Sequence, residues 1–139
     1  MKRHPTEIKY PVGIQSFKEL REGGYVYVDK TAFVYELTEG KYYFLSRPRR
    51  FGKSLFLSTL ECYYTGQREL FKGLALDSLT DDWEPHPVFH IDLNNREYKD
   101  ETSLTAHLNA HLKVWESVYG DEERNSAGEE RFAYLIRLR

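Results

Sequence analysis

The stretch from Lys41 to Tyr64 constrains the fold of this 139-residue chain more than any other part of it. It begins with the apolar run KYYFLS, passes through a basic turn, and continues with the apolar run KSLFLSTLECYY. The first run is apolar at successive positions, which is typical of a strand buried on both faces of a parallel sheet. The second run has the length and composition of a buried helix. A buried strand, a tight turn and a helix in this order favour an α/β fold.

The turn ends in Gly52-Lys53-Ser54, the last three residues of the phosphate-binding loop G-x-x-x-x-G-K-S. In such a loop the glycine lets the backbone approach the phosphates, the lysine contacts the β and γ oxygens, and the serine hydroxyl binds Mg²⁺. The backbone amides of residues 49–54 would complete the cradle at the start of the helix. This pattern predicts a site for a nucleoside triphosphate.

Two residues of the turn depart from the general loop. Arg47 stands where the first glycine is expected, so it must tolerate the backbone angle of that glycine. Pro48 offers no backbone N–H and removes one potential donor. On spacing alone, a basic surface turn without a ligand is therefore an alternative.

Similar patterns along the rest of the chain predict alternating elements. The turn pair Gly23-Gly24 precedes one short aromatic and β-branched run, and Asn94-Asn95 ends another. Ser16 and Glu19 have capping-box spacing at the start of a helix, and Gly66 and Gly120 are helix stops. Strands are expected at 25–28, 41–46 and 87–93, and helices at 16–22, 32–39, 53–64, 68–71, 101–118 and 131–139. The order predicts an α/β sheet.

Composition excludes several classes of protein. The length predicts one domain, and a net charge of -2 gives no general attraction to nucleic acid or membranes. No apolar run approaches the length of a membrane span, and no signal peptide is expected at the N-terminus. The single cysteine, Cys62, rules out a disulfide within the chain and fits a cytoplasmic location.

Three stretches resemble the predicted AAA-ATPase-like family: YPVGIQSFKELREGGYVYVDKT, YYFLSRPRRFGKSLFLSTL and LFKGL. Members are bacterial P-loop proteins in which RPRRFGKS is the family's own form of the Walker A loop. The resemblance implies that Arg47 is a family trait. It also implies ATP binding, with Mg²⁺-dependent hydrolysis in complete members, and complete members often carry a C-terminal domain similar to PD-(D/E)XK nucleases.

We therefore predict an α/β chain whose residues 1–139 form the N-terminal part of an AAA-like, three-layer P-loop NTPase domain. The expected ligands are ATP and Mg²⁺. Lys53 is the expected catalytic residue, and Ser54 is the expected magnesium ligand. The residues expected to bind the nucleotide are Arg49, Arg50, Phe51, Gly52, Lys53, Ser54 and Leu55.

Hydrolysis also needs a second acid near the magnesium ion. Asp92 follows the apolar run 88–91 and is the best candidate, although Leu93 stands where a catalytic glutamate is expected, and a turn role is the alternative. The resemblance implies a Walker B strand of the type Leu-Ile-Asp-Glu just after a helix like 131–139. The chain is therefore expected to be truncated before it, and the missing C-terminal part, with or without a nuclease-like domain, is an expected partner.

Two alternatives remain open at this point. The basic turn could contact the phosphate backbone in a nucleic-acid-binding module, although one tight cluster in a negative chain argues against direct binding. Asp29-Lys30-Thr31 resembles a family hallmark near the nucleotide, but Asp29 or Thr31 could equally cap the helix expected at 32–39.

Overall fold

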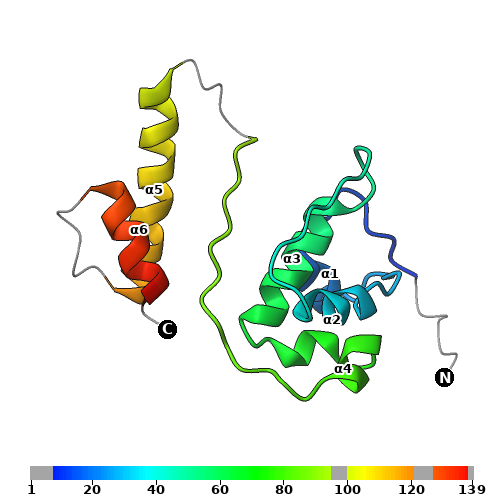
Figure 1. The fold of residues 1–139 in the computed structure, drawn as a ribbon. Helices are drawn as coiled ribbons and strands as arrows, with labels where there is room; N and C mark the ends of the chain where they lie inside the picture. The colour runs from blue at the N-terminus through cyan, green and yellow to red at the C-terminus, as the bar shows by residue number, and fades with distance from the viewer. Residues whose placement is uncertain (1–7, 95–99, 121–126, 138–139) are drawn as a thin grey trace, which may run out of the picture. The chain divides into compact units, whose positions relative to one another are not determined.

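The structure is a computed structural model that describes residues 8–94, 100–120 and 127–137. The chain forms two compact units, which we call the N-terminal unit (Met1–Val88) and the C-terminal unit (Phe89–Arg139). Figure 1 shows the helices of both along the chain. Each unit has its own hydrophobic core, so each is described by itself.

The regular elements among the described residues are helices, and all of them except α4 (Ala75–Leu79), which was not predicted, lie where the sequence pattern predicted a helix. Helix α5 (Glu101–Tyr119) is followed by Gly120 as its C-cap, the stop that the sequence predicted, whereas α6 (Gly128–Arg137) begins three residues before the expected start. The N-terminal unit contains α1 (Phe17–Glu22), α2 (Ala32–Thr38), α3 (Lys53–Tyr64), the 3₁₀ helix η1 (Arg68–Phe71) and α4 (Ala75–Leu79), and the C-terminal unit contains α5 (Glu101–Tyr119) and α6 (Gly128–Arg137).

The predicted α/β, three-layer P-loop fold is wrong. The described residues of 25–28, 41–46 and 87–93 form no strand, and the chain's single described bridge is an isolated parallel one between Lys9 and Tyr25. A strand exists only through repeated hydrogen bonds to a neighbouring strand, and among the described residues the run 25–28 makes only this one isolated bridge, while 41–46 and 87–93 make none. The 41–46 run is also not buried, because Tyr42 and Phe44 are each 93% exposed.

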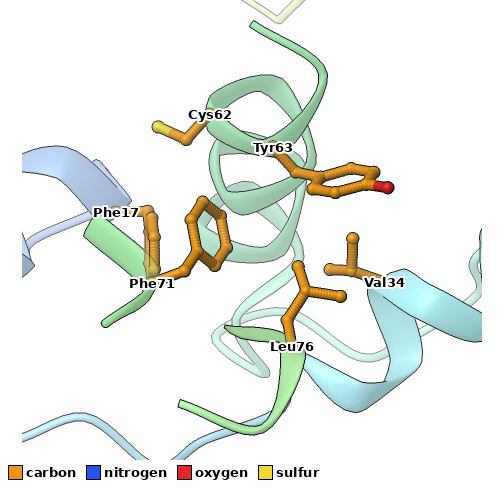
Figure 2. Close-up of a cluster of buried hydrophobic side chains, with 6 residues drawn as sticks. All are labelled: Phe17, Val34, Cys62, Tyr63, Phe71 and Leu76. Carbon is orange, nitrogen blue, oxygen red and sulfur yellow. The ribbon is translucent and has the colours of Figure 1, made fainter. Parts of the chain in front are cut away.

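The core of the N-terminal unit gathers around α3 and is largely aromatic (Figure 2). Phe71 is its centre, since its ring lies 4.9 Å from that of Phe17 and 5.1 Å from that of Trp83. Cys62 is buried there as a free thiol, and burial raises its pKa. Helix α1 begins where the sequence predicted, because the Ser16 hydroxyl accepts a hydrogen bond from the Glu19 amide at 3.2 Å. The buried set is Phe17, Val34, Cys62, Tyr63, Phe71 and Leu76.

The C-terminal unit is a helix pair held by an apolar cluster and by a buried ion pair between Arg131 and Glu116. Leu112, Trp115 and Leu135 form the cluster, and Phe89 packs against it. Helix α5 begins with a capping box between Asp100 and Ser103. These contacts fix α5 and α6 against each other.

Candidate functional site

The predicted phosphate-binding turn connects the irregular 41–46 segment to the start of α3. Gly52 is the N-cap of α3 and has a left-handed backbone, with φ 79° and ψ 22°. A Cβ atom at this position would meet nothing within 4 Å, so the backbone angle, and not lack of space, calls for glycine. The helix therefore begins at Lys53, which puts the lysine and the Ser54 hydroxyl in its first turn.

The first turn of α3 contains backbone amides that are available to a ligand. Phe56 is the first residue whose amide bonds back along the helix, to the Gly52 carbonyl at 2.9 Å. The amides of residues 53–55 make no hydrogen bond to the part of the chain that the structure describes. Free amides at a helix N-terminus carry a partial positive charge and suit an anion.

Arg50 carries backbone strain inside this turn. Its φ of 64° makes it the one non-glycine residue with a positive φ among the described residues. A left-handed backbone costs a residue with a Cβ about 1–2 kcal/mol, and such strain is concentrated at functional sites. The strain expected at Arg47 is not there, since Arg47 does not have a positive φ.

A cavity of about 400 Å³ opens beside the turn, between α2, residues 40–51 and α3. This volume is within the usual range for sites that bind small molecules. Its charged lining is strongly unbalanced, with four basic side chains and the single acid Glu36, and the rest is mostly apolar. The cavity therefore offers an anion a positive wall next to an apolar surface. The basic lining residues are Lys30, Lys41, Arg47 and Lys53.

Only part of the predicted site set lines this cavity. Phe51, Gly52 and Lys53 do, whereas Arg49, Arg50, Ser54 and Leu55 do not. Ser54 is exposed in the first turn of α3, and Leu55 packs against the core. The cavity adds Lys30 and Lys41, which the motif did not indicate.

Asp92 belongs to the C-terminal unit and has a turn-type hydrogen bond. Its carboxylate accepts from the Asn94 amide at 2.9 Å, and this bond is the main reason that the pKa of Asp92 lies below its usual range. Its carbonyl oxygen lies 2.9 Å from His107 Nε2. Within the described ranges, no group of three or more His, Cys, Asp or Glu side chains could hold a metal ion. The contacts of Asp92 are those of an Asx turn.

Asp29 and Thr31 link two segments that are distant in the sequence. The Asp29 carboxylate accepts hydrogen bonds from the Thr31 amide at 2.8 Å, the Thr31 hydroxyl at 2.7 Å and the Ala75 amide at 2.7 Å. The Thr31 hydroxyl in turn accepts from the Leu76 amide at 3.1 Å. Ala75 and Leu76 are the first two residues of α4. We call this arrangement the α4 clamp.

The α4 clamp corrects the alternative that Asp29 or Thr31 caps the helix expected at 32–39. Thr31 is the N-cap of α2 by position, but no side chain caps that helix. The two side chains instead cap α4, and sequence patterns cannot show this because a cap is normally sought beside its own helix. Lys30, between them, has an exposed side chain that lines the cavity.

No helix among the described residues has both the length and the apolar character to cross a membrane.

Comparison with solved structures finds no match for this chain. The chain is 43% identical, over 131 residues, to a protein of Azotobacter chroococcum mcd 1 described as an uncharacterized protein in the vnfD 5' region. The match covers 93% of this chain but only 25% of that protein, so the chain spans about a quarter of its relative. The family model of the AAA-ATPase-like family, described as predicted AAA-ATPase, matches residues 11–138. The chain therefore belongs to the predicted AAA-ATPase-like family.

Proposed function

We propose that this chain binds ATP with Mg²⁺ through residues 47–54 and the first turn of α3. One observation carries the proposal: Gly52-Lys53-Ser54 begins α3 with a left-handed glycine, beside a cavity with four basic lining residues. A polyphosphate needs a cation, backbone amides and a helix N-terminus in one place. Membership of a family named for a predicted ATPase supports the same ligand.

Each residue of the turn has a role that its chemistry permits. Lys53 neutralises the terminal phosphates, and the amides of residues 53–55 donate to phosphate oxygens. The Ser54 hydroxyl is an oxygen ligand of the kind that Mg²⁺ prefers. Arg49 and Arg50 add positive charge at the entrance, and Phe51 offers the nucleotide an apolar contact from the cavity lining. When bound, Mg²⁺ screens the negative charge of the phosphates.

We propose binding, and not hydrolysis, for the 139 residues themselves. Hydrolysis needs an acid that holds the magnesium shell and orients water. Asp92 is the one acid that the sequence offered for this role, and its carboxylate accepts a hydrogen bond from the Asn94 amide in an Asx turn. We propose that the missing acid belongs to a longer protein of this family, together with any nuclease-like domain.

Isothermal titration with ATP·Mg²⁺ tests the proposal. Lys53→Ala should weaken ATP binding at least about 100-fold, because it removes a charge-assisted contact to the phosphates. Lys18→Ala is the matched control, since Lys18 is an exposed lysine of α1, paired with Glu22 at 4.0 Å, that does not line the cavity. Its affinity should equal that of the wild type.

The same titration, repeated with DNA, distinguishes ATP binding from the nucleic-acid-binding alternative. Short duplex DNA should bind more weakly than ATP·Mg²⁺ and should lose its affinity steeply between two salt concentrations. An affinity for ATP that survives Lys53→Ala unchanged would show that the assignment is wrong. Tight binding of DNA without binding of ATP would favour the nucleic-acid-binding module.

A further inference from the structure

We infer that Lys30 is a second phosphate-contacting cation of the proposed ATP site, held in position by the α4 clamp. This inference rests on the proposed function and adds a residue that the phosphate-binding motif does not contain. It starts from the cavity lining, where Lys30 and Lys53 come from different segments and line the same cavity.

The hydrogen bonds of the clamp show which member of Asp29-Lys30-Thr31 can meet a ligand. Both carboxylate oxygens of Asp29 accept hydrogen bonds from backbone amides, and the Thr31 hydroxyl both donates and accepts. Thr31 is also fully buried. Lys30 is different, because its ammonium group makes no hydrogen bond or ion pair with the described part of the chain. It is the member of the three that is available to an anion.

The backbone that carries Lys30 is fixed on both sides. On one side Tyr27 packs against the core, with its ring 5.3 Å from that of Phe17. On the other side the clamp ties Thr31 to α4. The Lys30 carbonyl also accepts a hydrogen bond from the Phe33 amide of α2 at 3.2 Å. Binding a ligand therefore need not order the backbone at Lys30.

Lys41 and Arg47 line the same cavity but lack this support. Both lie in residues 40–51, where the structure describes no helix or strand, and both are exposed. A cation on a backbone that is already fixed by hydrogen bonds gives more affinity than an equal charge on an irregular segment, because less of the backbone has to be ordered on binding. Lys30 should therefore contribute more to phosphate binding than Lys41, which makes Lys41 the matched control.

The test compares Lys30→Met and Lys41→Met with wild type in titrations against ATP·Mg²⁺ and against tripolyphosphate. Both variants lose one positive charge and keep an unbranched side chain. Lys30→Met should lower the affinity for both ligands about tenfold, and Lys41→Met should lower it by no more than about threefold. Lys30→Arg should restore most of the affinity, and circular dichroism should show that all three variants keep the helices.

The outcomes separate this inference from the proposed function. Unchanged affinity in Lys30→Met, together with lost affinity in Lys53→Ala, overturns the role of Lys30 and leaves the ATP site standing. A loss in Lys41→Met as large as that in Lys30→Met overturns the importance of the clamp. A loss for ATP without a loss for tripolyphosphate shows that Lys30 does not contact phosphate. If wild type binds neither ligand, the proposed function and this inference both fail.

Discussion

Arg131 in the C-terminal unit and Lys53 in the N-terminal unit carry the same charge in opposite surroundings. Arg131 is only 8% exposed, and its guanidinium donates to both Glu116 oxygens, at 2.6 and 2.7 Å, and to Asn109 at 3.1 Å. These bonds to Glu116 are the main reason that its pKa is raised. Lys53 is exposed at the start of α3 and has no ion pair with a described residue.

The difference shows how a charge can be assigned to structure or to ligand. A buried charge is tolerated only when the fold supplies its partner, so Arg131 has a structural role. An exposed cation costs the fold little, and several together repel one another. The cations around the cavity have no such partners within the described chain, which fits a role toward an anion from outside. The two units should therefore respond differently to substitution.

The largest effect is expected for the buried ion pair. Arg131→Met should destabilise the C-terminal unit by about 3–5 kcal/mol, because it leaves the Glu116 carboxylate buried without the arginine. Each unit holds one tryptophan, Trp83 or Trp115, so urea unfolding can be followed by Trp115 fluorescence in a Trp83→Phe background. Replacing Glu116 by Leu as well should recover much of the loss.

The same substitution should not affect the N-terminal unit. Trp83 fluorescence in a Trp115→Phe background should report an unchanged unfolding midpoint for Arg131→Met. An equal loss in both signals would contradict the separation of the two cores, and a loss below about 1 kcal/mol in the Trp115 signal would contradict the structural role of the ion pair.

An intermediate effect is expected for the α4 clamp. Thr31→Val keeps the shape of the buried side chain but removes the acceptor of the Leu76 amide. An amide left without its partner costs about 1–3 kcal/mol, so the N-terminal unit should lose that much stability in urea unfolding followed by Trp83. Thr38→Val is the control, since Thr38 is exposed and its hydroxyl donates only to the Tyr35 carbonyl within α2. Equal effects of the two substitutions would argue against the clamp.

The smallest effect is expected in the pH dependence of Asp29. Desolvation acts to raise the pKa of Asp29, but the hydrogen bonds from Thr31 and Ala75 outweigh it and lower the pKa. A lowered folded-state pKa gives stability that is fully present above the unfolded value of about 3.9 and is lost as the pH falls through the folded value.

The N-terminal unit of wild type should therefore lose more stability between pH 5 and pH 3 than that of Asp29→Asn. Asp29 is exposed, so the difference should be no more than about 1 kcal/mol. Acid titration of the Trp83 unfolding midpoint in both proteins measures it. A steeper acid loss in Asp29→Asn would show that the sign of the shift is wrong.

The helices were predictable because their signals are local. The apolar run of α3 and the Ser16 cap of α1 each lie within a few residues of the helix they define. The sheet was not predictable in this way, because an apolar run such as 41–46 shows what can be buried but not whether a neighbouring strand pairs with it. The burial expected along α3 was also only partly found, since Leu57 is 46% exposed.

The candidate site was likewise predictable only where its signals are local. The Gly52-Lys53-Ser54 motif indicated the turn, and the structure gives Gly52 the left-handed angle that suits glycine. Lys30 could not be found from the motif, because its place depends on hydrogen bonds between Asp29, Thr31 and the distant start of α4. Local patterns predicted a phosphate-binding turn, and tertiary contacts bring Lys30 to the lining of the cavity beside that turn.

The most direct test of the ATP site is a titration of the ¹⁵N-labelled chain with ATP·Mg²⁺, followed by amide chemical shifts. The free amides of the first turn of α3 should donate hydrogen bonds to the phosphate oxygens, so the largest saturable shifts should occur at Gly52, Lys53, Ser54 and Leu55, with a smaller shift at Lys30. Lys53→Ala should abolish them at the same ATP concentration. Saturable ATP binding that leaves these amides unmoved, or an absence of any saturable shift, would contradict the proposed site.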